Sequence, residues 1–151
     1  MKPIDAGTYA ATATVEADDN YSGATSTPYA FTISKADATI SVTPYSVTYD
    51  GTMHTAVGAS EGVSLQSLSG LDLSGTEHTD AGTYNNDPWT FTDVTGNYND
   101  ASGTVNNFIG TKNLTVTAED QIKCFSETFL FAGTEFTSAG LVNLETIENV
   151  T

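Results

Sequence analysis

The five residues Asp-Ala-Gly-Thr-Tyr occur twice in this chain, at positions 5–9 and 80–84, which are 75 positions apart. Two further pairs of segments recur at nearly the same offset: Asn20-Tyr21 with Asn97-Tyr98, and 40–43 with 114–117. A period near 75 residues is long enough to enclose a small core, unlike the roughly 20 to 45 residues of a solenoid repeat. The recurrence therefore predicts small domains in tandem.

The repeat boundaries fall inside the sequence, so that one complete unit is flanked by two half units. Residues 38–112 form one complete unit. Residues 1–37 match only the second half of such a unit, and residues 113–151 match only the first half. The two flanks together would make up one more repeat.

Apolar and polar residues alternate over most of the chain, which is typical of strands with one face in a core. Tyr29, Phe31 and Ile33, for example, alternate with threonine, alanine and serine. Turn-forming residues such as Asp50-Gly51 separate these stretches, and no segment has the pattern of a capped amphipathic helix. We expect an all-β fold of tandem, small, antiparallel β-sandwich (Ig-like) domains of about 75 residues.

The chain carries 4 Lys and Arg against 19 Asp and Glu, a formal net charge of −15. Such a surface repels phosphate backbones and anionic lipids, so we expect no nucleic-acid partner. No apolar run approaches the roughly 18 residues that a membrane span requires, so no membrane insertion is expected either. Cys124 is the single cysteine and cannot form an intrachain disulfide; its alternating surroundings favour a buried side chain.

Several turns place acidic side chains close together, as a calcium site requires. None has the spacing of a helical calcium loop, and solvated turns are the alternative interpretation. No cofactor is required by the sequence, and calcium is the one cation it suggests. The candidate ligands are Asp18, Asp19, Asp93 and Asp100.

Trp89, Tyr84 and Tyr98 are candidates for an aromatic platform that stacks on sugar rings, with packing in the core as the alternative. His54 and His78 are the only histidines, and their surroundings lack the spacing of a closed zinc site. Nothing organises a nucleophile, a base and a carboxylate in one cleft, so we expect no enzyme. The repeated Asp-Ala-Gly-Thr-Tyr phrase is interpreted as a turn that leads into a strand.

Longer stretches carry a family resemblance. "YDGTMHTA" at 49–56, "LSGLDLSGTEHTDAGTYNNDPWTF" at 68–91 and "GNYNDASGTV" at 96–105 resemble the MBG (mostly-β, glycine-rich) repeats of bacterial cell-surface and adhesin-like proteins. The resemblance implies a spacer or stalk role, an extracellular or cell-surface location and no catalytic residues. Residues 123–136 resemble a related repeat type that has Tyr-Gly where Cys124-Phe125 or Phe125-Ser126 stands here.

Three arrangements of the half units remain open at this point. They pair between molecules into head-to-tail filaments, they pair within one molecule, or they contact neighbouring repeats of a longer chain. The expected function is that of a structural stalk or adhesin segment. A carbohydrate-binding surface module is the alternative, and it predicts that Trp89→Ala abolishes glycan binding without unfolding the chain.

Overall fold

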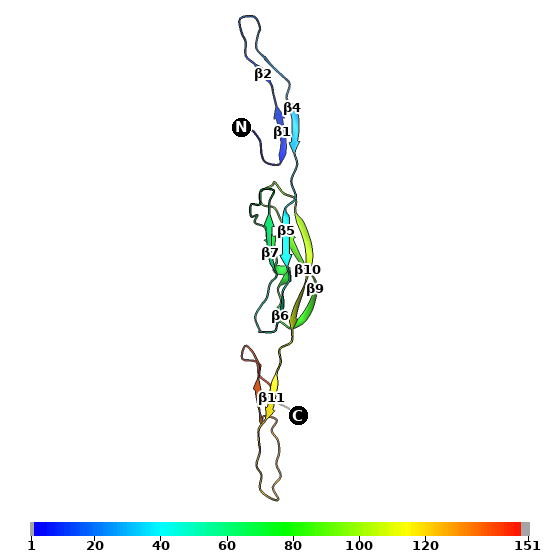
Figure 1. Cartoon of the computed structure of the whole chain (residues 1–151), viewed down its shortest axis with the longest axis vertical. Helices are drawn as coiled ribbons and strands as arrows, with labels where there is room; N and C mark the ends of the chain where they lie inside the picture. Colours follow the sequence, from blue (N-terminus) through cyan, green and yellow to red (C-terminus); the bar gives the residue numbers. More distant parts are fainter. Residues whose placement is uncertain (1, 149–151) are drawn as a thin grey trace.

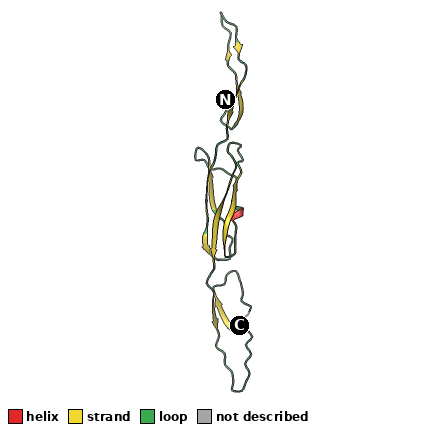
Figure 2. Cartoon of the chain, turned by 90° about the vertical axis from the view of Figure 1, so that its right-hand side faces the viewer, coloured by secondary structure: helices red, strands yellow, loops and turns green. Residues whose placement is uncertain are grey.

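The computed structural model describes residues 2–148 and is an extended rod with three sections (Figure 1). A β-hairpin forms each end of the rod, and a wider group of strands lies between them (Figures 1 and 2). The only helical element among the described residues is a short 3-10 turn, η1 (Ser74–Thr76), and no described helix could cross a membrane. The predicted all-β class is confirmed.

The middle section contains two sheets. In the first sheet, β5 (Thr39–Thr43) pairs antiparallel with β7 (Val57–Glu61). The second sheet has four strands, in the order β6 (Ser46–Thr48), β10 (Ala101–Gly110), β9 (Gly82–Phe91) and β8 (Leu71–Asp72). β6 runs parallel to β10, and the other neighbours are antiparallel.

The long β9–β10 pair contains a β-bulge. Asp87 lies opposite Val105, and Tyr84 lies opposite Asn107. Between these two pairs β9 therefore advances by three residues while β10 advances by two. Asn86 takes up the extra residue with a left-handed φ of 61°, a conformation that asparagine tolerates better than most residues. The bulge changes the phase of the strand, so Tyr84 and Asp87 both point to the inner face although three positions separate them.

The buried core lies in the middle section and is half polar. The largest described side chains with less than 2% exposure are Phe91, Ile109, Asn107 and Thr76. The accessible surface of the chain is 11164 Å², whereas a compact monomer of 15.8 kDa would expose about 7,300 Å². Much of this excess follows from the two end hairpins, which have no second layer within the described residues.

The end hairpins repeat pairings of the middle section. In the N-terminal hairpin, β1 (Gly7–Ala11) pairs antiparallel with β4 (Tyr29–Ile33), and its tip holds β2 (Thr14–Val15) and β3 (Ala24–Thr25). Gly7 lies opposite Ile33 there, as Gly82 lies opposite Ile109 in the β9–β10 pair.

In the C-terminal hairpin, β11 (Thr115–Ala118) pairs antiparallel with β12 (Phe136–Ala139). Thr115 lies opposite Ala139, as Ser41 lies opposite Ala59 in the β5–β7 pair. Cys124 lies on the long loop between β11 and β12 and is exposed, so the expectation of a buried cysteine is wrong. The apolar alternation around Cys124 has no partner layer that would bury it.

The location of the core predicts that the same Phe→Ala change has very different effects on the free energy of unfolding at two positions. Phe91→Ala removes a ring that is 1% exposed, and Phe125→Ala removes one that is fully exposed. We expect Phe91→Ala to lower the free energy of unfolding of the middle section by about 3–5 kcal/mol, because a cavity replaces the ring. Phe125→Ala should change it by less than about 0.5 kcal/mol. Denaturant titration followed through Trp89 fluorescence measures both, and equal losses would contradict this location of the core.

Candidate functional site

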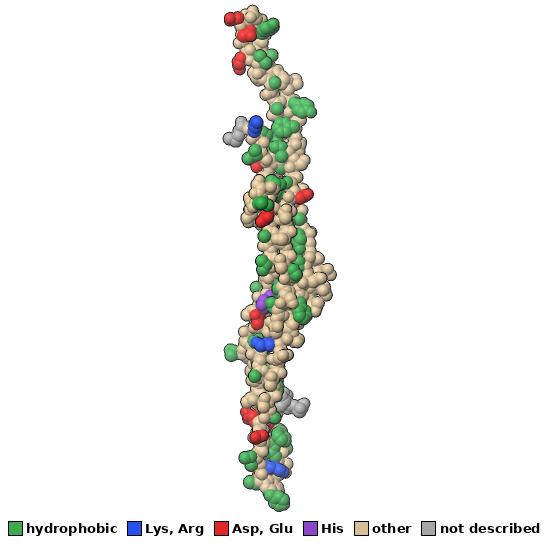
Figure 3. Space-filling view, viewed as in Figure 1, with side chains coloured by type: hydrophobic (Ala, Val, Ile, Leu, Met, Phe, Trp, Pro, Cys, Tyr) green, Lys and Arg blue, Asp and Glu red, His purple; other side chains and the backbone are tan. Residues whose placement is uncertain are grey.

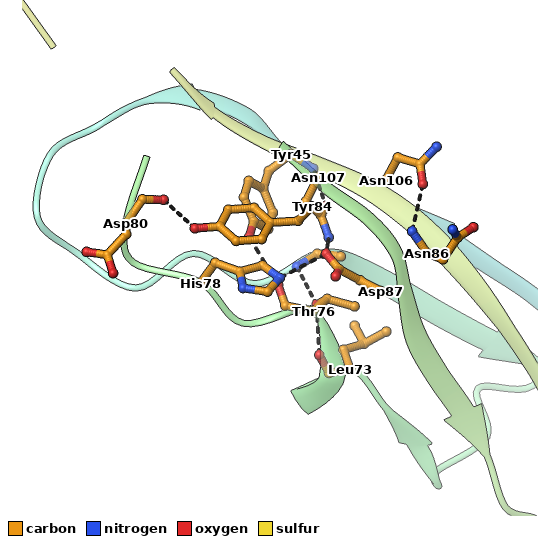
Figure 4. Close-up of polar contacts among 11 residues, drawn as sticks. Tyr45, Leu73, Thr76, His78, Asp80, Tyr84, Asn86, Asp87, Asn106 and Asn107 are labelled. Carbon is orange, nitrogen blue, oxygen red and sulfur yellow. Dashed lines mark hydrogen bonds and ion pairs between the residues drawn. The ribbon is translucent and has the colours of Figure 1, made fainter. Parts of the chain in front are cut away.

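Asp87 and Asn107 form a buried polar pair in the core of the middle section (Figure 4). Asn107 Nδ2 donates a hydrogen bond of 2.7 Å to Asp87 Oδ2, and His78 Nε2 lies 3.0 Å from the same oxygen. Asn107 Oδ1 accepts a bond of 3.1 Å from the backbone N–H of Tyr45, next to β6. The pair therefore joins β9, β10 and the chain that leads into β6.

Thr76 extends this cluster on the other side (Figure 4). Its hydroxyl, which is fully buried, donates to Leu73 O at 2.7 Å and accepts from the backbone N–H of Ala56 at 3.0 Å. The Tyr45 hydroxyl donates to Thr76 O at 3.1 Å. Burial, and secondarily the negative charge of Asp87, raises the pKa of Tyr45, so this hydroxyl keeps its proton. No buried side-chain N or O among the described, non-exposed residues lacks a partner, which is how a structural cluster is built.

The two histidines face different carboxylates. Their backbones form a bridge, with His54 N–H donating to His78 O at 2.9 Å. His54 Nε2 lies 3.0 Å from Asp50 Oδ1, whereas His78 contacts Asp87 and stacks on the Tyr84 ring at 3.5 Å. Within residues 2–148, no three His, Cys, Asp or Glu side chains are grouped to hold a metal.

An Asp–His pair raises the question of catalysis. His78 and Asp87 resemble the base and the orienting carboxylate of a triad, but a triad also needs a nucleophile on the second ring nitrogen. No described serine, threonine or cysteine makes a hydrogen bond to His78, and Tyr84 covers one face of its ring. The absence of enzyme activity stays a prediction.

The repeated Asp-Ala-Gly-Thr-Tyr phrase forms the same corner in both copies. Tyr84 Oη donates to the backbone oxygen of Asp80 at 2.6 Å, and Tyr9 Oη donates to that of Asp5 at 2.9 Å. A Cβ added at Gly82 would lie 3.1 Å from Tyr84 Cζ, so the tyrosine folds closely over the glycine. This geometry supports the structural interpretation of the phrase and explains why the five residues recur together.

The four calcium candidates lie in two separate turns. Asp18, near the tip of the N-terminal hairpin, accepts hydrogen bonds from the backbone N–H groups of Asn20 and Tyr21 at 2.8 and 2.7 Å. These bonds lower the pKa of Asp18. Asp19 beside it is exposed. Both bonds are accepted by Asp18 Oδ1, so this oxygen holds the turn.

Asp93 lies 75 positions after Asp18, between β9 and β10, and its carboxylate also holds a turn by accepting backbone hydrogen bonds. It accepts from the backbone N–H groups of Thr95 at 3.0 Å and Tyr98 at 2.9 Å, while Asp100 accepts from the N–H of Asp93 at 2.9 Å. Desolvation, the largest contribution, would raise the pKa of Asp93, but the hydrogen bonds from Tyr98 and Thr95 outweigh it and lower the pKa to about 2. Calcium binding stays a prediction.

The three aromatic candidates contact protein neighbours. Tyr98 is 5% exposed, and its hydroxyl accepts from Gln66 Nε2 and from the backbone N–H of Val63. Tyr84 stacks on His78. Trp89 is half-buried and covers Gly103, where an added Cβ would lie 2.4 Å from the indole. Of the three rings, Tyr98 is too buried to meet a sugar, and a glycan platform stays a prediction.

Each end hairpin is joined to the middle section by side-chain hydrogen bonds. At the N-terminal joint, Asn97 Oδ1 accepts from the N–H of Ala6 at 2.7 Å and Asn97 Nδ2 donates to Asp5 Oδ1 at 3.1 Å. Asn97 O also accepts from the N–H of Ala36 at 2.9 Å. Asp5 and Asn97 both belong to the repeated phrases, so the recurrence itself is the sequence signal for this joint.

The C-terminal joint is built in a similar way. Asn143 Nδ2 donates to Gly51 O, and Tyr49 Oη donates to Glu145 Oε1. The bond to Glu145, followed by desolvation, raises the pKa of Tyr49. A repeated motif does mark these two residues, because the sequence VNLETI at 142–147 resembles VSLQSL at 63–68. Asn143 and Glu145 therefore stand at the positions of Ser64 and Gln66, and Leu144 has a left-handed φ of 61° as Leu65 has one of 57°.

Comparison with known protein families, with the curated proteins and with the solved structures found no match. The resemblance to MBG repeats therefore rests on the quoted motifs.

The tyrosine corner predicts a measurable loss on removal of one oxygen. Tyr84→Phe keeps the ring on Gly82 and removes the bond to Asp80 O. We expect the free energy of unfolding to fall by about 0.5–1.5 kcal/mol, the net value of one hydrogen bond. Tyr29→Phe is the matched control, since Tyr29 is 76% exposed. Equal denaturation midpoints for the two variants would contradict the corner.

The Asp93 turn predicts acid sensitivity. Because the folded pKa of about 2 lies below the ordinary value of 3.8, its contribution is complete above pH 3.8 and is lost as the pH falls through about 2. Asp93→Asn should lower Tm at neutral pH and flatten the fall of Tm between about pH 4 and pH 2. Asp19→Asn is the control and should follow the parent protein. Thermal melts over this range test it, and parallel curves for all three proteins would refute the assignment.

Proposed function

We propose that this chain is a structural segment of an extended bacterial cell-surface protein, a stalk or adhesin segment of tandem, small, Ig-like β-sandwich domains. Residues 38–112 are one complete domain in this proposal. Residues 1–37 and 113–151 are the second and first halves of others. The proposal places the chain outside the cell.

The observation that carries the proposal is the matching strand register of the end hairpins and the middle section. The three β1–β4 pairs of residues 7–9 have the register of the β9–β10 pairs of residues 82–84, before the bulge. In the β11–β12 pair, Thr115 lies opposite Ala139 as Ser41 lies opposite Ala59 in the β5–β7 pair. Each hairpin thus reproduces one part of a two-sheet unit and lacks the other part. The three sections lie end to end along one axis, as a spacer requires (Figure 1).

The polar contacts fit the same role. The Asp87 cluster is internally satisfied, and the acidic candidates Asp18 and Asp93 hold turns with their carboxylates. Both joints use paired side-chain bonds, which restrict bending between sections. A stalk requires this resistance to bending more than it requires a pocket.

A covalent tandem fusion of two copies tests the proposal. The fusion places residues 113–151 of the first copy directly before residues 1–37 of the second, which completes one additional domain. We expect the denaturation signal of the end segments to become cooperative, and the rod to lengthen by a constant amount with each further copy. Small-angle scattering and circular dichroism measure these properties. A fused junction that melts without cooperativity would refute a role as tandem domains.

A further inference from the structure

Both end hairpins leave apolar side chains uncovered (Figure 3). On the N-terminal hairpin, Tyr29 is 76% and Phe31 is 37% exposed. Phe31 lies opposite Tyr9 as Asn107 lies opposite Tyr84, so Phe31 occupies a position that is buried in the middle section. On the C-terminal hairpin, Leu114 and Val116 are 48% and 43% exposed. Soluble proteins seldom leave such faces open.

The N-terminal hairpin also has a free strand edge. Within the described residues, β4 pairs only with β1, whereas the corresponding strand β10 has β6 at its second edge. There β6 runs parallel to β10 with Val47 opposite Ile109. The N–H of Phe108 donates to Tyr45 O at 3.1 Å, and the N–H of Tyr49 donates to Gly110 O at 2.8 Å. A free edge of this kind is a template for an added strand.

The C-terminal hairpin carries a segment that corresponds to β6 and has no strand partner among the described residues. Ser126 has a left-handed φ of 69°, as Gly51 has a φ of 74°, which aligns the turn at 124–126 with the turn at 49–51. This alignment places Ile122 at the position of Val47. Ile122 is 94% exposed.

We propose that the N-terminal hairpin of one copy docks on the C-terminal hairpin of a second copy and completes a domain between them. Residues 32–34 pair in parallel with residues 121–123, and Ile33 lies beside Ile122. This inference rests on the proposed function, and it names the partner of the open faces as another copy of the same chain. The contact is heterologous, so it propagates into an open head-to-tail filament.

The N-terminal joint supplies a second expected contact. Asp5 and Asn97 bond across that joint, and their repeat equivalents are Asp80 and Asn20. In the filament, Asn20 of the docking copy meets Asp80 of the receiving copy as Asn97 meets Asp5. The same joint is thus used within one chain and between chains.

The net charge of −15 opposes association of two copies. Salt screens this repulsion, since the Debye length falls from about 10 Å at 0.1 M to about 3 Å at 1 M. Filament length should therefore increase with sodium chloride. Assembly that weakens as salt is added would overturn the proposal, because the docking surface is apolar and backbone-paired rather than ionic.

Disulfide trapping in the full chain tests the register. In a Cys124→Ser background, Thr32→Cys and Gln121→Cys occupy the positions of Phe108 and Ser46, which are direct partners in the middle section. Oxidation of the double variant should give a ladder of covalent multimers. Oxidation of a mixture of the two single variants should give a cross-linked heterodimer. Glu16→Cys with Gln121→Cys is the out-of-register control. We expect on the order of tenfold more cross-linking in register, since a disulfide requires Cα atoms within about 7 Å.

A charge substitution separates docking from folding. Ile122→Asp should abolish the multimers seen by light scattering while leaving the Trp89 fluorescence melt unchanged. Val94→Asp adds the same charge at a residue of the β9–β10 loop that is 69% exposed, and it should still assemble. A parent protein that stays monomeric at high salt, without cross-linking above the control, overturns the inference. A cooperative tandem fusion in that case leaves the stalk function standing.

Discussion

The hydrogen bond between Asn107 and Asp87 is the contact on which the middle section depends. It joins β9 to β10 at a position with almost no solvent, while the amide oxygen of Asn107 accepts a hydrogen bond from the backbone N–H of Tyr45, which leads into β6. A buried carboxylate is costly unless it is paired, and Asp87 is paired twice, with Asn107 and His78. Removal of either partner would leave charge unsatisfied inside a very small core.

A small core also limits what each end hairpin can do alone. Two strands bury little surface, and an isolated hairpin is at best marginally stable in water. Both hairpins nevertheless repeat the register of a two-sheet unit, so their sequences favour a partner layer that the described chain does not place on them. The joints at Asn97 and Asn143 attach the hairpins to the middle section without covering their apolar faces.

Periodicity predicted most strands because the side-chain period of two is a local property. It could not predict Thr76 and Asn107 as core residues, since polar residues in an alternating pattern are assigned to the outer face. The bulge at Asn86 also shifts the phase of β9 by one residue, and only the pairing with β10 reveals that shift. Cys124 was misplaced for the opposite reason, because alternation marks a face as apolar without showing that anything covers it.

The acidic residues show how composition and local geometry can suggest different roles. Clustered aspartates suggest a cation site, yet Asp18 and Asp93 lie at the same position of successive repeats and bind backbone N–H groups. A hydrogen bond to the charged form lowers the pKa of a carboxyl, so each turn is most stable when its aspartate is ionised. The same charges repel neighbouring copies of the chain. Turn stability and self-association therefore make opposite demands on one set of residues, and the balance between them depends on ionic strength.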